Sequence, residues 1–186
     1  MSLPQAKTPF SAADYLVWES ERIEKSEFYH GEVFAMSGAS RRHVTVSGNL
    51  FSSLDQALEG TPCRPYMADM KLRVLEDDAY FYPDVFVTCD PADHRADQFM
   101  SAPTLVVEVL SPSTAAFDRG DKFAAYRRIP SLREFVLIDP EKQTIELYRR
   151  GGDDTWALHD IAAGEPLPLG SLEIEIGWGR IFRNLD

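Results

Sequence analysis

Hydrophobic positions are densest over residues 105–110, where five of six residues are aliphatic and the sixth is Glu108. A short apolar run that ends in Ser111, Pro112 and Ser113 is typical of a strand buried on both faces. A carboxylate in such a strand loses its hydration, which costs free energy unless a metal ion, a cation or hydrogen-bond donors receive it. The pattern therefore indicates that Glu108 needs partners from elsewhere in the chain.

Three segments have the apolar spacing and end signals of helices. Ser11 and Asp14 form a capping-box pattern at the start of the first. Pro130 stops the last, because a residue before proline is disfavoured in helical conformation. The predicted helices cover residues 11–26, 43–59 and 118–129.

Alternating apolar positions and continuous apolar runs predict the strands. Residues 27–36 alternate as a β-hairpin does, and within 80–88 the side chains of Asp84 and Phe86 share one face. The polar segment 91–103 is predicted to be an exposed loop. The other predicted strands are 71–75, 105–110 and 134–139, followed by a β-rich tail at 145–148, 155–158 and 172–176.

The resulting order is helix, strand, strand, strand, helix and strand, followed by strands alone. A single α/β sheet of mixed α+β type, with helices packed on it, fits this order best. The chain has 186 residues and no long linker, so one domain is expected. Its expected parts are an N-terminal helix over 11–26, a core over about 28–140 and an antiparallel β extension over 141–186.

The charge balance argues against a broad nucleic-acid-binding surface. The net charge is −11, from 30 acidic and 19 basic residues, whereas phosphate binding normally rests on a basic surface. Arginine doublets stand at 41–42, 127–128 and 149–150, and each fits a solvated surface better than a phosphate contact. The sequence has no apolar run near the roughly 20 residues of a membrane span and no signal-peptide pattern. We therefore expect no membrane partner and a cytoplasmic location.

Cys63 and Cys89 are the only cysteines in the chain. There is no Cys-x-x-Cys pair and no pair of histidines beside them, which argues against structural zinc. Two cysteines also argue against a disulfide scaffold and suit a reducing cytosol.

Asp84 and Glu108 lie on consecutive predicted strands, so their carboxylates could lie close together on one face. Such a pair repels unless a cation lies between or beside the two groups. A hard divalent ion with oxygen ligands is the simplest remedy, Mg²⁺ first and Mn²⁺ as a substitute. Lys122, on the following helix, could reach the same place. An acid pair with an ammonium group predicts phosphodiester hydrolysis, in which the ion helps to ionise water and the lysine orients it or offsets phosphate charge.

The same residues carry a resemblance to a known family. The chain closely resembles the bacterial Uma-two family, assigned to the restriction-endonuclease-like PD-(D/E)XK superfamily, over about residues 10–183. The resemblance implies an α-β-β-β-α-β core and metal-dependent DNA cleavage. The segments that carry it are 82–85, 107–113, 118–122 and 136–140, with Tyr126 and the shorter segments 30–32 and 69–71.

The resemblance carries over residue by residue. Asp84 matches the first acid of the superfamily motif and Glu108 the second. The motif lysine would stand two residues after Glu108, where this chain has Leu110. Lys122 matches the position to which the lysine of the resembling family has moved. Asp84, Glu108 and Lys122 are therefore the candidate catalytic residues, with the two acids as metal ligands.

Three further positions match the family. Glu32 matches a third acid expected near the metal, although a glutamate after a hairpin glycine is common without any function. His43 is better explained as a residue at the start of a helix than as a catalyst. Asp69 matches a recurring position for which the sequence suggests no role.

The leading hypothesis is an Mg²⁺-dependent endonuclease that hydrolyses DNA as a homodimer, since two strands need two sites. Two alternatives stay open. One is a non-catalytic binding or assembly module with the same fold, which the acidic balance and Leu110 favour. The other is a hydrolase of a different phosphate ester. For Glu108 itself, a buried salt bridge with Lys122 is the alternative to a metal site.

Overall fold

The apolar strand that contains Glu108 lies inside a six-stranded sheet, as its burial on both faces predicts. The computed structural model describes residues 10–36, 38–74 and 78–186. In spatial order the strands of this sheet are β11 (Trp156–Ile161), β10 (Thr144–Arg150), β9 (Glu134–Asp139), β8 (Pro103–Val109), β6 (Val85–Thr88) and β3 (Arg64–Met67). β8 pairs in parallel with β9 and antiparallel with β6.

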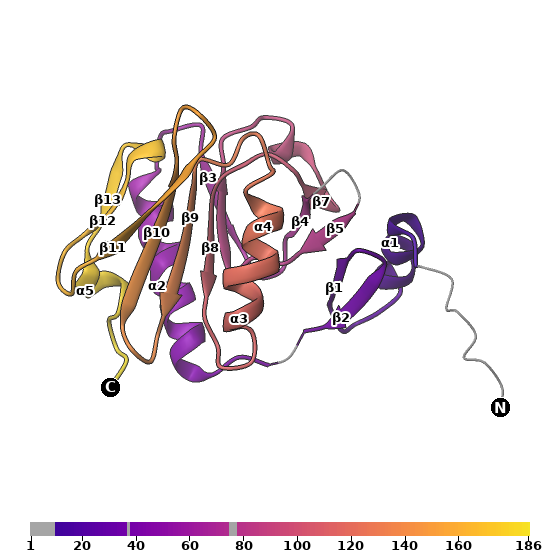
Figure 1. The fold of residues 1–186 in the computed structure, drawn as a ribbon, viewed down its shortest axis with the longest axis horizontal. Helices are drawn as coiled ribbons and strands as arrows, with labels where there is room; N and C mark the ends of the chain where they lie inside the picture. Colours follow the sequence, from indigo (N-terminus) through magenta and orange to yellow (C-terminus); the bar gives the residue numbers. More distant parts are fainter. Residues whose placement is uncertain (1–9, 37, 75–77) are drawn as a thin grey trace.

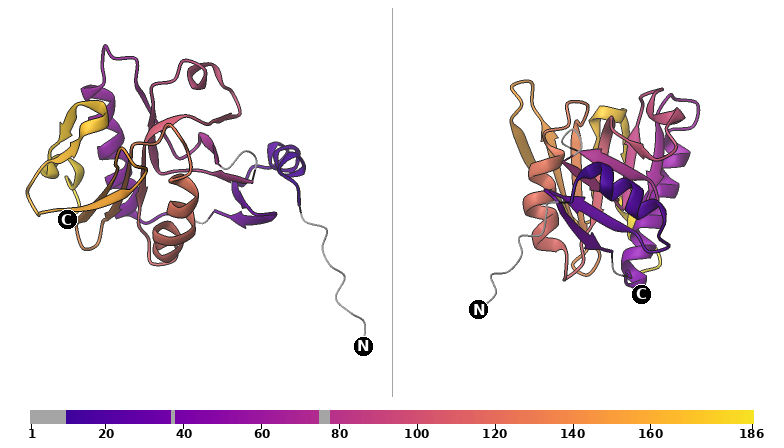
Figure 2. Two further views of the ribbon diagram at one scale, coloured as in Figure 1. Left: turned by 45° about the horizontal axis from the view of Figure 1, so that its top comes forward. Right: turned by 90° about the vertical axis from the view of Figure 1, so that its right-hand side faces the viewer.

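Helices cover both faces of this sheet (Figures 1 and 2). On one face lies α2 (Arg41–Ala57), whose Leu50 packs in one core with Val107 of β8. On the other face Val106 of β8 packs in a second core with Tyr126. The helical segment on that face consists of α3 (Ala115–Phe117), a π-helical turn η2 (Asp118–Lys122) and α4 (Phe123–Tyr126). None of the helices described is long and apolar enough to cross a membrane.

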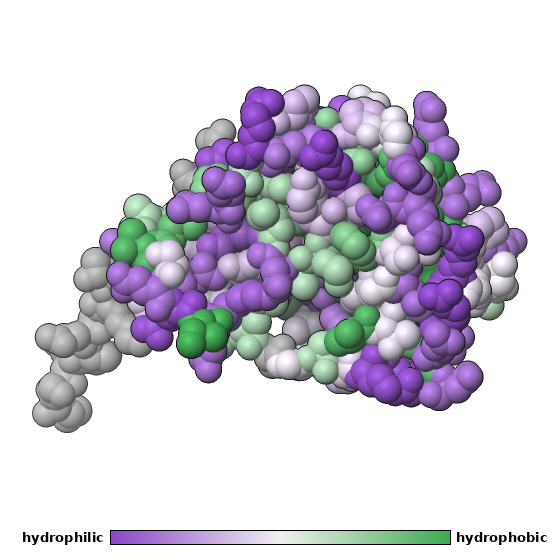
Figure 3. Space-filling model, turned by 180° about the vertical axis from the view of Figure 1, so that it is seen from behind, coloured by the Kyte–Doolittle hydropathy of each residue, from purple (hydrophilic) through white to green (hydrophobic). Residues whose placement is uncertain are grey.

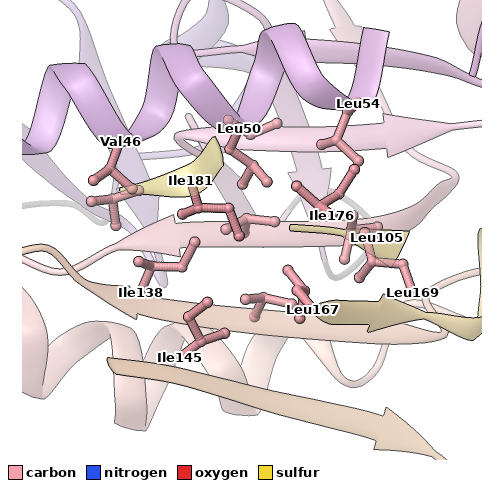
Figure 4. Close-up of a cluster of buried hydrophobic side chains, with 14 of the residues drawn as sticks. Val46, Leu50, Leu54, Leu105, Ile138, Ile145, Leu167, Leu169, Ile176 and Ile181 are labelled. Atoms are coloured by element: carbon pink, nitrogen blue, oxygen red, sulfur yellow. The ribbon is translucent and has the colours of Figure 1, made fainter. Parts of the chain in front are cut away.

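The C-terminal elements close the core on the α2 side (Figure 4). They are β12 (Leu167–Leu169), the 3₁₀ turn η3 (Gly170–Leu172), β13 (Ile174–Ile176) and α5 (Trp178–Ile181). Leu50 and Leu54 of α2 point toward Ile176 and Ile181 from these elements. β12 and β13 pair antiparallel, which confirms the antiparallel β-rich extension, whereas α5 was not predicted.

The N-terminal elements form a second sheet of five strands, in the order β2-β1-β5-β4-β7. Their bounds are β1 (Ser26–Tyr29), β2 (Glu32–Ala35), β4 (Lys71–Val74), β5 (Ala79–Phe81) and β7 (Phe99–Met100). The helix α1 (Ala12–Ser20) packs on this sheet through Tyr15, whose ring lies 5.1 Å from that of Phe28 and 5.6 Å from that of Tyr80. Ser11 and Asp14 form the predicted capping box. Seen from behind, the surface is mostly hydrophilic, with apolar residues gathered toward its middle (Figure 3).

The mixed α+β class is confirmed, but the expected single sheet is wrong. The predicted strand 80–88 is broken, because β5 ends at Phe81 and β6 begins at Val85. The break falls at Pro83, which has no N–H to donate to a strand ladder. The chain passes here from the smaller sheet to the larger one, and this crossing places Asp84 directly before β6.

The segment 91–103 is not the exposed loop that its polarity predicts. It contains the 3₁₀ turn η1 (Asp93–Arg95) and β7, and Asp93 is only 4% exposed. The Asp93 carboxylate accepts hydrogen bonds from the Thr88 hydroxyl and the backbone N–H of Ser101, each at 2.9 Å. A polar side chain that satisfies backbone donors therefore ties this segment to the sheet.

Helix boundaries differ from the predictions by several residues. The first helix ends at Ser20 instead of residue 26, and the last begins at Ala115 and ends at Tyr126 instead of covering 118–129. The second is close to its prediction. The short strands β3, β7 and β12 were not predicted, because two to four residues carry too little periodicity.

Cys63 and Cys89 are joined by a disulfide, which the sequence analysis did not predict, since it argued only against a disulfide scaffold. β3 and β6 pair with Arg64 opposite Thr88, so the residues just outside this pair lie opposite each other. The register that brings them together is not visible in the cysteine count. The count therefore does not support a reducing compartment.

Two of the arginine doublets bind backbone carbonyl groups, although Arg41 is also exposed to solvent. Arg41 donates to the carbonyl of Asp186 at 2.6 Å, and Arg42 to that of Leu185 at 2.9 Å. Arg150 donates to the carbonyl of Ile129 at 2.9 Å. These guanidinium groups hold chain segments together, and Arg150, whose side chain is only 7% exposed, is not the solvated surface residue that was expected.

Glu134 attaches the C-terminal elements to the edge of β9. Its side chain is 0% exposed and accepts hydrogen bonds from Arg149 Nε at 2.8 Å and from the backbone N–H groups of Gly170 and Ser171, each at 3.1 Å. A buried carboxylate is tolerated when donors surround it in this way. It fixes the η3 turn that follows β12.

Glu134→Ala should destabilise the protein by about 3 kcal/mol, because it leaves a guanidinium and two backbone N–H groups without their acceptor. Urea unfolding followed by circular dichroism measures the loss. The control Glu165→Ala, at an exposed position, should change the free energy of unfolding by less than about 0.5 kcal/mol. Equal effects of the two substitutions would contradict this role of Glu134.

Candidate active site

A cavity of about 600 Å³ opens where the two sheets meet. Its walls come from the β1–β2 hairpin, the first turns of α2, the start of β6, the end of β8 and the helical segment from α3 to η2. Asp84, Glu108 and Lys122 all line it, so the structure brings the three predicted catalytic residues together. The fold thus gathers into one place side chains that lie up to 38 positions apart in the sequence.

Asp84 and Glu108 are linked by reciprocal hydrogen bonds between their strands. In the β6–β8 pair Val85 lies opposite Val107, so Asp84 and Glu108 follow as neighbours at the end of the ladder. The backbone N–H of Val109 donates to Oδ2 of Asp84 at 2.7 Å, and that of Asp84 donates to Oε2 of Glu108 at 3.4 Å. The two acids therefore lie side by side, as the sequence pattern predicts.

Glu108 receives two side-chain donors from the following helix. Lys122 Nζ lies 3.2 Å from its Oε1, and the Tyr126 hydroxyl donates to the same oxygen at 2.8 Å. Glu108 is only 3% exposed. Lys122 and Tyr126 are four residues apart, so they lie on the same face of the helix. The salt bridge with Lys122 that the sequence left as an alternative is therefore present.

Lys122 is surrounded by carboxylates. Besides Glu108, its Nζ lies 2.9 Å from Oε1 of Glu27 and 3.7 Å from Oδ1 of Asp118. The residue is 6% exposed and ends the π-helical turn η2. Such a turn is an irregular insertion that often marks a functional site.

Glu27 is a site residue that the sequence analysis missed, and it occupies the place expected for Glu32. Glu27 is 8% exposed and lines the cavity, where its Oε1 also accepts from the Tyr82 backbone N–H at 3.0 Å. Glu32 lies two positions further along the same face of the hairpin, opposite Tyr29, and is exposed outside the cavity. Phe28 packs into the N-terminal core. Because neighbouring side chains along a strand point to opposite faces, the alternation along β1 could have shown that Glu27 points to the other side.

His43 has both the expected structural role and a contact with the site. Its backbone N–H donates to the capping hydroxyl of Ser40 at 3.2 Å, which confirms its place at the start of α2. Its ring Nε2 lies 3.2 Å from Oδ2 of Asp84. Burial lowers the pKa of His43, but the hydrogen bond and the charge of Asp84 outweigh burial and raise the pKa above its usual value.

Negative charge exceeds positive charge in the cavity. Burial raises the pKa of Glu108 well above that of a free carboxyl group, against the lowering effect of Lys122. The pKa of Asp118 is raised too, again mainly by burial. Burial alone would lower the pKa of Lys122, but Glu108, Glu27 and Asp118 together raise it, so the ammonium group stays charged. One lysine thus faces three carboxyl groups, and a fourth, that of Asp84, lies in the same cavity beside His43.

The donor chemistry of these residues fits a hard divalent cation. Oδ2 of Asp84 and Oε1 of Glu108 are engaged, whereas Oδ1 of Asp84 accepts no hydrogen bond from the described residues and Oε2 of Glu108 accepts only the long one. Carboxylate oxygens with room for water are the ligands that Mg²⁺ takes. In the described part of the chain, no group of three or more His, Cys, Asp or Glu side chains is placed to hold a metal ion, so a cation here would take two carboxylates and water.

Comparisons with known proteins identify the family of this chain. Residues 12–181 match the model of the Uma2 family, described as "Putative restriction endonuclease". The chain belongs to the Uma2 family. Its relatives include slr1290 of Synechocystis sp., named as uncharacterized, which is 38% identical over 183 residues that cover 98% of this chain and 96% of the relative. A second uncharacterized Synechocystis protein, sll1609, is 38% identical over 153 residues, or 81% of this chain and 86% of the relative.

A crystal structure shows that the fold is shared. It is described as a "putative nuclease belonging to DUF820" from Anabaena variabilis and matches with a TM-score of 0.77 at 18% identity. The match covers 96% of this Uma2 chain and 100% of the other. The restriction-endonuclease-like fold expected from the sequence is confirmed.

The structure explains why this Uma2 chain has leucine at the usual lysine position. Leu110 is 4% exposed and packs in the same core as Val106 and Leu137. A lysine there would bury its ammonium group among apolar side chains. Lys122 reaches Glu108 from the helix instead. Asp69 lies outside the cavity, at an exposed position where it pairs with Lys25.

Lys122→Met in this Uma2 protein should lower the free energy of unfolding by about 3 kcal/mol near neutral pH, since it leaves buried carboxylates without a cation. The loss should be smaller at pH 5, where protonation neutralises carboxyl groups whose pKa is raised. Urea unfolding at both pH values measures it. Lys142→Met, at a side chain that is 75% exposed, is the matched control. A loss no larger than in the control would contradict the role of Lys122.

His43→Gln should flatten the pH dependence of stability. Because the folded protein raises the pKa of His43, the protonated ring stabilises the fold fully below its ordinary pKa of about 6.5. This stabilisation is lost as the pH rises through the raised value. Unfolding free energies measured from pH 6 to pH 9 should therefore fall more steeply in the wild type than in the variant. Parallel curves would show that the Asp84 contact does not hold the proton.

Proposed function

We propose that this chain is a divalent-metal-dependent endonuclease that hydrolyses phosphodiester bonds of DNA. The observation that supports it best is the pairing of Asp84 and Glu108 beside a buried lysine in an open cavity. Membership of a family described as "Putative restriction endonuclease" agrees with this chemistry. A homodimer with one site for each strand is part of the proposal.

Asp84 and Glu108 would hold the cation through the oxygens that protein donors leave free. When bound, Mg²⁺ or Mn²⁺ supplies Lewis-acid polarisation of the phosphate and lowers the pKa of bound water. The cation would also lower the electrostatic repulsion among the carboxyl groups that line the cavity. The raised pKa of Glu108 means that proton release accompanies binding, so metal affinity should rise with pH.

The remaining groups position these two acids and carry charge. His43 holds Oδ2 of Asp84, and the Val109 N–H fixes the same oxygen, so the carboxylate has one orientation. Lys122 has three N–H donors, of which Glu27 and Glu108 take two. Asp118 lies further away at 3.7 Å. The third N–H is thus the one available to water or to a phosphate oxygen on which charge develops.

Supercoiled plasmid incubated with the purified protein should be nicked in Mg²⁺ or Mn²⁺ and left intact in EDTA. Asp84→Asn and Glu108→Gln should each lower the rate by about 100-fold or more, since each removes a charged oxygen donor at the reacting phosphate. Asp160→Asn, at an exposed position on β11, is the control and should leave the rate unchanged. Absence of cleavage with every metal would support the binding module, and cleavage of a small phosphate ester alone would support a different hydrolase.

A further inference from the structure

The outer wall of the cavity is apolar, in contrast to its acidic interior. Phe34, Met36 and Val44 line it and are 40%, 41% and 58% exposed. They are three of the six large apolar side chains exposed among the described residues. Phe117, from the opposite wall, lies with its ring 6.0 Å from that of Phe34. Scattered apolar residues on a surface are ordinary, but a cluster at the mouth of a cavity is typical of a ligand site.

The cavity lacks the cationic groups that hold a duplex. Among the described residues that line it, Lys122 is the only lysine or arginine, and two carboxylates already bind it. Arg41 and Arg42, at the nearby start of α2, are occupied by carbonyl groups of the C-terminal segment. Affinity for a continuous duplex comes largely from phosphate contacts and would be weak here.

The size of the cavity fits one nucleotide. A volume of about 600 Å³ is in the range of sites that enclose a small molecule, and a base pair within a stacked duplex cannot enter it. Enzymes that act in such a pocket take a single strand or a base that has left the stack. Stacking of an unpaired base on an aromatic ring contributes about 1–3 kcal/mol and needs no basic surface.

We propose that the Phe34–Phe117 mouth of the cavity binds an unpaired base, so that single-stranded DNA is the preferred substrate over continuous duplex. This inference rests on the proposed nuclease function for the identity of the ligand. The base lies against Phe34 and Met36, and the adjoining phosphate lies toward Asp84 and Glu108 at the acidic end. The net charge of −11 is then compatible with DNA binding, because apolar contact and a metal ion replace basic side chains.

Binding is measured separately from cleavage, by fluorescence anisotropy in Ca²⁺, with one oligonucleotide as a single strand, as a duplex and as a duplex with a central unpaired bubble. The single strand should bind at least about tenfold more tightly than the duplex, as expected from the stacking of one base. The bubble should recover most of this difference. A 2-aminopurine base in the strand should change its fluorescence on binding.

Phe34→Ala should weaken single-strand binding about tenfold and leave duplex binding unchanged. Phe34→Tyr should retain binding, and Phe34→Leu, which keeps apolar volume without a ring, should not. Leu158→Ala removes a side chain that is 50% exposed on β11, away from the cavity, and should have no effect. Thermal unfolding of each variant shows whether it is folded. If Phe34→Ala does not fold, Met36→Ala tests the same wall of the cavity.

The outcomes separate this inference from the proposed function. Equal or tighter binding of the duplex, or equal effects of Phe34→Ala and Leu158→Ala, would overturn the preference for an unpaired base even if plasmid is cleaved. Single-strand binding that depends on Phe34 without cleavage in any metal would support the base site and overturn the nuclease assignment.

Discussion

The burial of one carboxylate, that of Glu108, governs the arrangement of this protein around its cavity. A glutamate in a fully buried strand requires donors, and the chain provides them from two separate segments, the residue before β6 and the helical segment after β8. Lys122 can reach Glu108 only if the helix after β8 packs on that face of the sheet. The backbone of Asp84 reaches it only if the chain crosses between sheets at Pro83. Satisfying this group therefore fixes the positions of the residues expected to do chemistry.

The donors do not neutralise the site, because Lys122 is shared among Glu108, Glu27 and Asp118. A cluster built only for stability would be expected to match charges or to use apolar residues of similar volume. Burial is the main cause of the raised pKa of Glu108 and Asp118, and neighbouring carboxyl groups raise both further, against the lowering effect of Lys122. An energetic cost of this kind is commonly found at functional sites, and a cation that takes oxygen ligands would reduce it.

Much of this could be predicted from the sequence because it depends on local patterns. The apolar run around Glu108, the helical stripe of α2 and the 134–139 strand are each long enough to show their period, and each is found as predicted. The convergence of Asp84 with Glu108 followed from adjacent strands. The rest depends on register and on distant contacts. Glu27 reaches the cavity and Glu32 does not, because the hairpin register places Glu32 opposite Tyr29, two positions further along the same face. The cysteine pair forms because β3, too short to be predicted, lies beside β6.

The arginines show how a composition can mislead about binding. Counting charges treats each guanidinium group as free to bind a partner. Arg41, Arg42 and Arg150 instead donate hydrogen bonds to backbone carbonyl groups of the chain itself. These guanidinium groups keep their charge, but fewer of their N–H groups are free to donate to phosphate than the residue count suggests. For a nuclease this restricts recognition to what the cavity offers, namely aromatic rings at its mouth and acids that a metal ion can bridge. An unpaired strand presents bases to such a cavity, whereas a duplex presents mainly phosphates, so the same acidic balance that argues against general DNA binding favours recognition of a single strand.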